Sequence, residues 1–422
     1  MIDRVAELVG AVAPLILAAA GAALLAPSAP AAILWPTAPT NGAQHDGDVK
    51  AIVLSPSATL AVFSADSTNA VPGRNGKRQV YGRALGKTSV GAARILTRRG
   101  AALGNLDSDQ SDVNAALGLD VSADGRYVVF ESQARNLVPG FQDGNGNGYD
   151  IFVLDRSTGA ITLVSKARTG PKSSNGDSKG GRISGDGRYV VFQSSSSDLV
   201  ASPAINAHVP QVFVRDLVAK TTRMVSVNRL GKASNPFSEH GDISADGRYV
   251  VFATDDPDMT TGDVNGFRDV FRKSLVTGQV VRVSRRVAGQ TNEAGGSDFP
   301  TISGDGRYVA FESDAKLVPG DAGNKDVYRR DLRPGHATTT LVSLRKDGQQ
   351  FGSDANRPSI DADGTRIVFT TAGNDAGSGD TNNQVDVYVR NLVSKHSLWV
   401  SQTAGGMPSG GDSTGRTASA RE

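Results

Sequence analysis

Short runs of apolar residues recur along this chain at a nearly constant spacing. One of them ends the segment ISGDGRYVVF at Phe192. Similar segments end at Phe130 (VSADGRYVVF), Phe252 (ISADGRYVVF), Phe311 (ISGDGRYVAF), Phe369 (IDADGTRIVF) and, in a weaker form (LSPSATLAVF), Phe63. Successive phenylalanines are 58 to 67 residues apart. Self-similarity at a fixed period indicates tandem supersecondary units that bury a continuous core by stacking on one another.

Each repeat predicts the same four short strands. In the second copy they span residues 119–122, 127–132, 150–155 and 161–165. The first two flank a tight turn at 123–126, where Asp accepts local backbone hydrogen bonds and Gly adopts a conformation that other residues avoid. The fourth strand ends in Val-Ser in five copies, at Ser165, Ser226, Ser284, Ser343 and Ser401. Four strands in sequence order are the content of one antiparallel propeller blade.

The second strand of each repeat is apolar at every position instead of alternating, as in 127–130. Such a strand is covered on both faces of its sheet. A β-sandwich would leave one face polar, and a parallel α/β sheet would need helical crossovers, which the pattern lacks between residues 44 and 404. The sequence therefore predicts an all-β fold, a six-bladed β-propeller of four-stranded antiparallel blades, preceded by an N-terminal signal or anchor segment.

The repeated segments resemble the WD-type repeat of TolB-like β-propellers. The resemblance rests on S-x-D-G-R-x-V-x-F, on DIFVLDR and its relatives, and on the final Val-Ser, and it covers about residues 44 to 404. It implies an exported, non-catalytic interaction protein. The same propeller also occurs as the gating domain of prolyl-oligopeptidase-like enzymes, and we expect no hydrolase domain beside the repeats in 422 residues.

The N-terminal region predicts export. Residues 9–26 form an apolar run, and A-x-A at 29–31 marks a cleavage site of the signal-peptide type. An uncleaved membrane anchor and a buried helix are the alternatives. Either a cleaved signal peptide or an uncleaved anchor would place the propeller outside the cytoplasm, in the periplasm or the medium. The expected parts are a signal peptide or anchor (1–31), a linker (32–48), a propeller (49–404) with blades at about 49–103, 115–170, 179–230, 239–288, 298–347 and 356–404, and a tail (405–422).

The charge balance and the lack of cysteine limit the kinds of partner and anchor that the protein can have. Lys and Arg total 45 against 43 acidic residues, so no strong field favours nucleic acid. The absence of cysteine excludes disulfides, thiol catalysis and a lipid anchor on cysteine. We expect a monomer whose partner is a protein or cell-envelope component, with membrane contact only through the possible N-terminal anchor.

One loop carries a candidate calcium site. Asp143, Asn145, Asn147 and Asp150 follow the spacing D-x-N-x-N-x-x-D through a glycine-rich segment. Ca²⁺ takes six to eight oxygen ligands, which alternate positions of a bent loop supply. An ordinary turn between strands uses the same residues.

At a second set of positions the residue type differs from blade to blade, while the flanking residues follow the repeat. These positions precede the S-x-D-G turn, and we expect them in the loop that returns the chain to the central channel. The ligand-face candidates are Lys179, Glu239, His240, Asp298, Phe299, Asn356 and Arg357, with Gly180 at one matching position. Variable chemistry on a repeating frame is typical of a binding surface, although unselected loop tips vary in the same way. The Arg of each D-G-R turn is expected to join neighbouring blades.

Two classes of function fit these residues. The first is a non-catalytic binding or scaffold protein, stabilised by calcium if the Asp143 loop holds the ion. The alternative is a calcium-dependent, lactonase-like hydrolase with a metal in the central channel, for which Glu239, Asp298 and Asn356 could supply ligands. No residue stands apart as a base or nucleophile. A sialidase-like propeller is disfavoured because the repeats lack the Asp-box ending in Thr-Trp.

Overall fold

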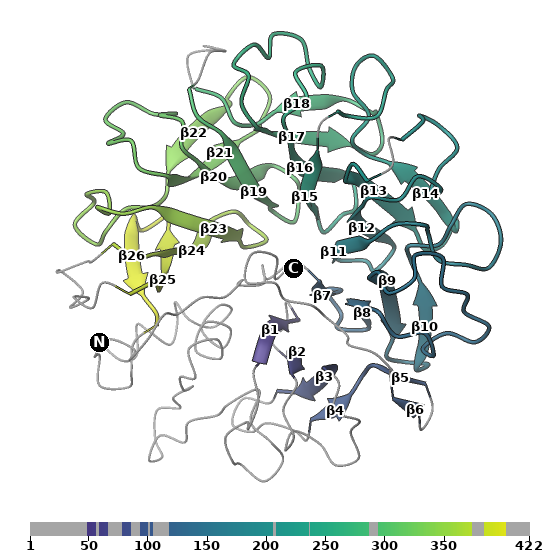
Figure 1. Ribbon diagram of the computed structural model, residues 1–422. Helices are drawn as coiled ribbons and strands as arrows, with labels where there is room; N and C mark the ends of the chain where they lie inside the picture. Colours follow the sequence, from purple (N-terminus) through teal and green to yellow (C-terminus); the bar gives the residue numbers. More distant parts are fainter. Residues whose placement is uncertain are drawn as a thin grey trace, which may run out of the picture. The chain divides into compact units, whose positions relative to one another are not determined.

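The computed structural model describes residues 49–55, 59–65, 78–85, 93–99, 102–103, 118–205, 208–235, 237–286, 294–373 and 384–401. These residues form six four-stranded antiparallel sheets and one short ribbon, with no helix among them (Figure 1). The protein is a six-bladed β-propeller, as the repeats predict. The expected signal peptide or anchor, the linker and the tail lie outside the described residues, and no described helix has the length and apolar character to cross a membrane.

Contacts divide the chain into two compact units, one within Leu34–Val227 and one within Ser234–Glu422. The first unit holds blades one to three. Their strands are β1 (Val49–Leu54), β2 (Leu60–Ala65), β3 (Gln79–Ala84) and β4 (Arg94–Ile95), then β7 (Leu119–Val121), β8 (Tyr127–Ser132), β9 (Asp150–Asp155) and β10 (Ala160–Leu163), then β11 (Ser178–Ile183), β12 (Tyr189–Ser194), β13 (Gln211–Asp216) and β14 (Thr221–Met224). A small ribbon of β5 (Arg98–Arg99) and β6 (Ala102–Leu103) follows the first blade.

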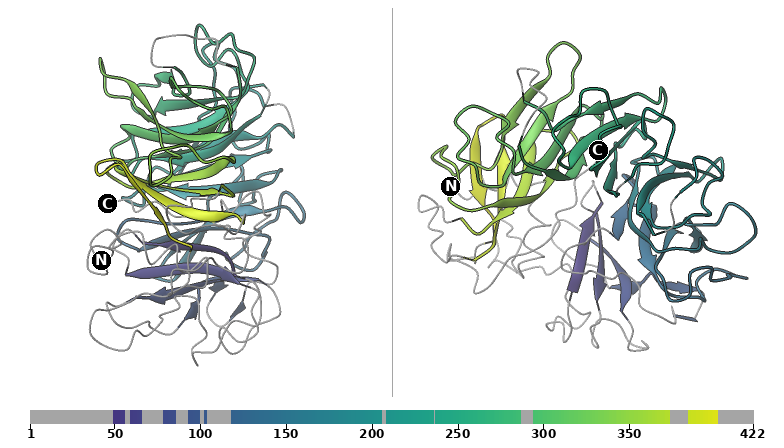
Figure 2. Two further views of the ribbon diagram at one scale, coloured as in Figure 1. Left: turned by 90° about the vertical axis from the view of Figure 1, so that its left-hand side faces the viewer. Right: turned by 45° about the horizontal axis from the view of Figure 1, so that its top comes forward.

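The second unit holds blades four to six. Their strands are β15 (Ser238–Ile243), β16 (Tyr249–Thr254), β17 (Asp269–Ser274) and β18 (Val280–Arg282), then β19 (Ser297–Ile302), β20 (Tyr308–Ser313), β21 (Asp326–Asp331) and β22 (Thr338–Leu341), then β23 (Ala355–Ile360), β24 (Arg366–Thr371), β25 (Asp386–Asn391) and β26 (His396–Trp399). Within each blade the strands lie side by side in sequence order as one twisted sheet (Figure 2).

The phenylalanine that marks each repeat is a core residue. It lies on the second strand, is fully buried in all six blades, and stacks on an aromatic ring of the third strand. The pairs are Phe63 with Tyr81, Phe130 with Phe152, Phe192 with Phe213, Phe252 with Phe271, Phe311 with Tyr328 and Phe369 with Tyr388, with ring centroids 5.3 to 6.1 Å apart. The six residues therefore occupy equivalent buried positions, as expected of second strands that are covered on both faces. Each pair joins the two strands that carry most of a blade's apolar surface.

In blades two to six the final serine donates a hydrogen bond to the first residue of the third strand, and in blade one Thr97 makes the equivalent bond to Gln79. In blade two the Ser165 hydroxyl accepts a hydrogen bond from the Ile151 amide (3.0 Å) and donates one to the buried Asp150 carboxyl (2.8 Å). In blade three a side-chain amide replaces the carboxyl group, and the Ser226 hydroxyl donates a hydrogen bond to Gln211 at 2.8 Å. The bond satisfies a polar group that burial would otherwise leave without a partner.

The glycine of the D-G-R turn serves the contact between neighbouring blades. Gly306 has a φ of 74°, and a Cβ there would overlap the ring of Tyr249, which belongs to the preceding blade. Gly187 and Gly364 stand in the same relation to Tyr127 and Tyr308. Glycine is required at this turn for its positive φ and for the close approach of the neighbouring ring.

The arginine of the same turn differs from its predicted role. Arg188 pairs with Asp216 of its own blade at 2.8 Å, so it joins the second strand to the third rather than one blade to the next. The register of β12 and β13 places Tyr189 opposite Asp216, so Arg188, the residue before Tyr189, lies close to Asp216. Blade-to-blade bonds come from third-strand arginines instead, since Arg272 Nη1 donates to the Gly306 carbonyl at 2.6 Å.

Candidate functional site

The first strand of blades three to six contains a β-bulge. In β15, Glu239 pairs with Ala253 and Asp242 with Val251, so one extra residue stands between the pairs. The residue at the bulge has a positive φ, which is 68° at Gly180, 55° at His240, 48° at Phe299 and 53° at Arg357. The ligand-face candidates therefore lie on strands and not in the predicted loop. The bulge breaks the alternation by which a strand is recognised, and this explains the wrong assignment.

Three of these four bulge residues are not glycine. A left-handed backbone costs a residue with a Cβ about 1 to 3 kcal/mol, whereas glycine adopts it freely. Gly180 shows that the blade accepts glycine at this position. His240, Phe299 and Arg357 therefore keep side chains at a backbone position that glycine would occupy at lower cost.

These side chains meet across three consecutive blades. The His240 ring stacks on the Phe299 ring with centroids 4.0 Å apart, and the Arg357 guanidinium lies 6.0 Å from the centroid of Phe299. His240 Nδ1 lies 2.6 Å from Asp298 Oδ1. We call the group of Glu239, His240, Asp298, Phe299 and Arg357, with the side chains that contact them, the bulge cluster.

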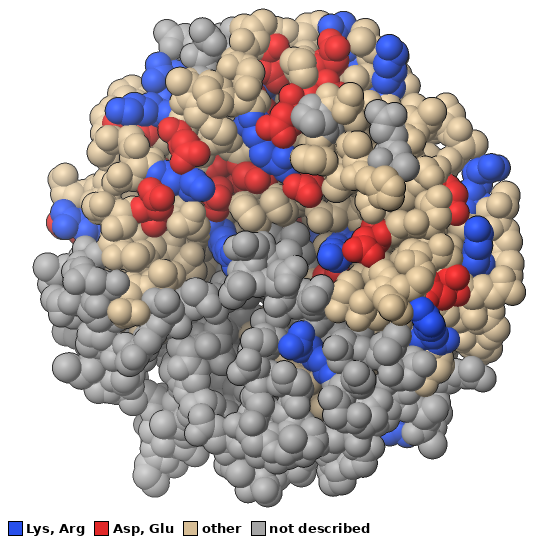
Figure 3. Space-filling model, viewed as in Figure 1, with Lys and Arg blue, Asp and Glu red and all other residues tan. Residues whose placement is uncertain are grey.

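Arg268 anchors the acidic side of the bulge cluster. Its guanidinium nitrogens lie 3.3 Å from Glu239 Oε2, 3.0 Å from Asp255 Oδ2 and 3.0 Å from Asp298 Oδ2. Figure 3 shows acidic and basic side chains gathered over β15 and β19. One cation thus holds three carboxylates that repulsion would otherwise separate.

A related pair continues the cluster into the next blade. Glu312 Oε2 accepts a hydrogen bond from the Arg357 amide (2.8 Å), and its other oxygen lies 3.6 Å from Lys325 Nζ. Arg268 and Lys325 both stand directly before the third strand of their blades. Sequence reasoning missed both of these basic residues. A comparison of the residue that precedes the third strand in each blade would have found them, because the residue type at this position changes from blade to blade.

Two carboxyl groups, Asp298 and Glu312, have displaced pKa values. Burial by itself raises the pKa of Asp298, but the hydrogen bond from His240, the charge of Arg268 and the Phe299 amide together bring it below its usual value. Burial raises the pKa of Glu312, partly offset by the Arg357 amide and by Lys325. Asp298 therefore stays ionised at neutral pH and keeps its ionic contact with Arg268.

The remaining two ligand-face candidates stand apart from these contacts. Lys179 belongs to the other unit, where its ammonium lies 3.6 Å from Asp177 and 5.4 Å from the ring centroid of Tyr149. Asn356 precedes Arg357 on β23, and its backbone carbonyl accepts a bond from Thr370 Oγ1 at 3.3 Å. Five of the seven candidates come together in the second unit.

Three of the four predicted calcium ligands already have protein partners at an oxygen, whereas the buried Asn145 Oδ1 has none among the described residues. Asp143 Oδ2 lies 2.6 Å from Arg135 Nε, and Asn147 Oδ1 accepts a bond from Arg135 Nη2 at 2.9 Å. Asp150 is the buried acceptor of Ser165. Within the described residues no group of three or more His, Asp or Glu is placed to hold a metal. Calcium at this loop would have to displace Arg135, and it stays a prediction.

No protein-family model matches the chain, and no curated protein matches it. Among solved structures it is similar to TolB from Acinetobacter baumannii, with 15% identity, 85% of this chain and 64% of that chain covered, and a TM-score of 0.40. The chain is thus similar to TolB structures, as its repeat motifs predict. An oligogalacturonate lyase from Vibrio parahaemolyticus shares 15% identity (84% and 79% covered, TM-score 0.49), and the β-propeller domain of the Trilobed protease from Pyrococcus furiosus 10% (82% and 81% covered, 0.46).

The chain spans about two thirds of the length of the Acinetobacter TolB. Identities of 10 to 15% and TM-scores below 0.5 support no inference about ligand or activity. The propeller fold rests on the six sheets of the chain itself, and function has to be argued from its side chains.

Proposed function

We propose that this TolB-like propeller is a non-catalytic binding protein outside the cytoplasm, and that the bulge cluster is its ligand surface. The observation that carries the proposal is the left-handed backbone of His240, Phe299 and Arg357 at one equivalent position in three blades. Local strain of this kind persists where it positions functional groups. The apolar run at 9–26 supports export.

The chemistry of the cluster suits a protein segment or another cell-envelope component. The stacked rings of His240 and Phe299 offer a flat, partly exposed surface, since both residues are only half-buried. Carboxylates and basic groups lie around it in nearly equal number, which favours a partner that carries both charges. Nucleic acid would need a basic surface.

A metal-dependent hydrolase, the alternative, fits this geometry less well. Its metal ligands would include Glu239 and Asp298, and both carboxylates contact Arg268. A divalent cation at the same oxygens would lie against the guanidinium charge, which opposes binding. The contacts of Arg268 therefore favour ligand recognition over metal chemistry at the bulge cluster.

The test replaces His240, Phe299 and Arg357 together with glycine, the residue that blade three has at this position. The matched control is Val276→Ser with Val393→Ser, two valines that are 73% and 75% exposed in surface turns. Cross-linking to cell-envelope extract should yield a defined partner with wild type and the control, and about tenfold less of it with the glycine variant. Equal yield from a folded glycine variant would refute the proposal. One metal ion per chain, whose removal abolishes hydrolysis of a lactone, would favour the enzyme.

A further inference from the structure

A cavity of about 630 Å³ lies between blades two and three in the first unit. It is lined by residues 166–168 after β10, by residues 199–202 between β12 and β13, by Arg215 of β13, by β14 with its preceding turn, and by Val227. Its apolar wall comes from Leu199, Val200, Met224 and Val227. The volume falls within the range of about 300 to 1,000 Å³ that small-molecule sites occupy.

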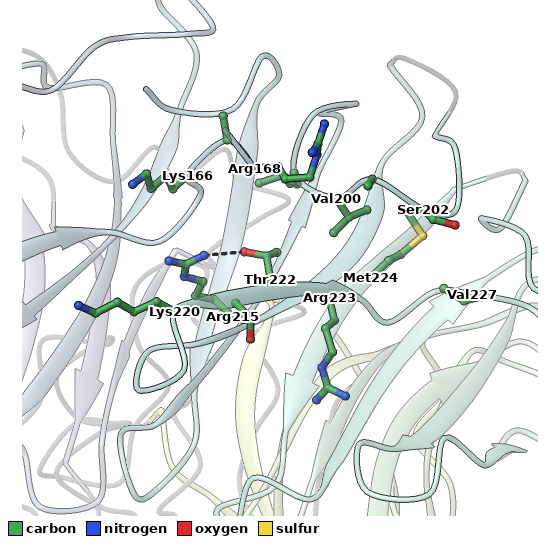
Figure 4. A pocket seen from close by; sticks show the side chains of 14 residues that line it. Lys166, Arg168, Val200, Ser202, Arg215, Lys220, Thr222, Arg223, Met224 and Val227 are labelled. Atoms are coloured by element: carbon green, nitrogen blue, oxygen red, sulfur yellow. Dashed lines mark hydrogen bonds between the residues drawn. The ribbon is translucent and has the colours of Figure 1, made fainter. Parts of the chain in front are cut away.

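The polar lining of this cavity is strongly basic. Its 14 residues include five cations and no carboxylate, and the cations are Lys166, Arg168, Arg215, Lys220 and Arg223. Within the described part of the chain, no carboxylate lies within ion-pair distance of any of the five. Figure 4 shows the Arg215 and Thr222 pair between Lys166, Arg168 and Lys220. Clustered positive charges in a concave, partly apolar site attract an anion.

Comparison with blade five shows how the cavity arises. There Arg330 Nη1 donates to Thr339 Oγ1 (2.6 Å) and to the Arg285 carbonyl of the preceding linker (3.0 Å). Thr339 Oγ1 donates to the same carbonyl, so the junction between the blades is closed by hydrogen bonds.

Blade three keeps the arginine and the threonine but not this closure. Arg215 Nη1 donates to Thr222 Oγ1 at 3.0 Å, as in blade five. The carbonyl that corresponds to that of Arg285 belongs to Lys166, and among the described residues neither Arg215 nor Thr222 bonds to it. Burial lowers the pKa of Arg215, an effect that the nearby Asp216 partly offsets. A half-buried guanidinium with donors to spare thus faces the cavity.

We propose that this cavity is a binding site for a small ligand with two or more anionic groups, carboxylate or phosphate. One anionic group binds Arg215 and Thr222, because a guanidinium can donate two parallel hydrogen bonds to such a group. Lys166, Arg168 and Lys220 bind the others, while Leu199 and Met224 contact the carbon skeleton. The site belongs to the first unit and is independent of the bulge cluster.

The probes are tripolyphosphate and citrate, titrated calorimetrically into the purified chain at about 50 and about 200 mM NaCl, since screening weakens exposed ionic contacts. Lys220→Gly is a mild variant, because Lys220 has a φ of 58° and the matching turn residue of blade two is Gly159. Its control is Lys395→Gly, which removes one charge from the same turn position (φ 58°) of blade six. Arg215→Leu with Thr222→Ile reproduces the Leu154 and Ile161 pair of blade two.

Wild type and Lys395→Gly should bind at least one probe with equal affinity. Lys220→Gly should weaken binding several-fold, and the Arg215 and Thr222 double variant at least tenfold, with unfolding midpoints unchanged. Binding of tripolyphosphate alone identifies a phosphate site, and binding of citrate alone a carboxylate site. Failure of wild type to bind either probe overturns the proposal. So does an equal loss in Lys220→Gly and Lys395→Gly, which would indicate attraction to net charge only.

Discussion

The buried Asp150 should make the stability of this protein depend on pH, and Asp150→Asn should remove that dependence. Burial, reinforced by the nearby Asp143 and Asp177, raises the pKa of Asp150 from 3.8 to about 7, although hydrogen bonds from Ser165 and Ser173 oppose the change. The side chain is only 2% exposed, so solvent does little to screen the effect. In the folded protein the carboxyl is therefore protonated at mildly acidic pH.

The sign follows from the two pKa values. A carboxyl whose pKa is raised on folding binds its proton more tightly in the folded state, so its contribution is fully present below about pH 4. The contribution is lost as pH rises through the folded pKa of about 7. At about 1.4 kcal/mol per tenfold change in proton affinity, Asp150 costs up to about 4 kcal/mol at pH 8 relative to pH 4.

The substitution Asp150→Asn removes the titrating carboxyl group and keeps an acceptor for the hydrogen bond from Ser165. Blade three already has an amide there, since Gln211 accepts the bond from Ser226. Urea unfolding followed by circular dichroism from about pH 4 to about pH 8 should show that Asp150→Asn is within about 1 kcal/mol of wild type at the acid end. At the alkaline end it should be more stable by up to about 4 kcal/mol. Other titrating groups, such as Asp326 with a pKa of about 6, affect both proteins equally and cancel.

The reciprocal change, Gln211→Glu, introduces a carboxyl group at the equivalent buried position of blade three. The free energy of unfolding of this variant should fall with rising pH more steeply than that of wild type. Parallel profiles for Asp150→Asn and wild type would refute the reasoning. A variant less stable than wild type at the alkaline end would show instead that the ionised carboxylate is the stabilising form, as a calcium ion at the Asp143 loop would require.

Two further predictions concern the turns. Gly306→Ala should destabilise the protein by at least about 2 kcal/mol more than Gly231→Ala in chemical denaturation, since both have a positive φ but only at Gly306 would the methyl group overlap a ring, that of Tyr249. Equal losses would show that φ alone matters. If calcium binds the Asp143 loop, chelator should lower the melting temperature of wild type and leave Asp143→Ala unchanged. A chelator without effect on wild type would leave an ordinary turn, in which Asp143 pairs with Arg135.

The sequence by itself determined the six blades, because what specifies a blade is local. The buried phenylalanine recurs in all six units of about 60 residues, and the turn glycine and the final serine recur in five of them; each makes its contacts inside its own blade or with the adjacent one. Comparison of equivalent positions likewise pointed to His240, Phe299 and Arg357. It placed them in a loop, because the extra residue of a bulge interrupts the alternation that identifies a strand.

Only the tertiary structure decided what those positions do. The stack of His240 on Phe299 and the contact of Arg268 with Asp298 join residues of neighbouring blades that are about 30 to 60 positions apart, and no periodic pattern encodes such a contact. The basic cavity depends on the hydrogen bonds missing at one junction between blades. Arg215 and Arg330 look alike in the sequence, and they differ only in whether the neighbouring linker approaches closely enough to accept a bond.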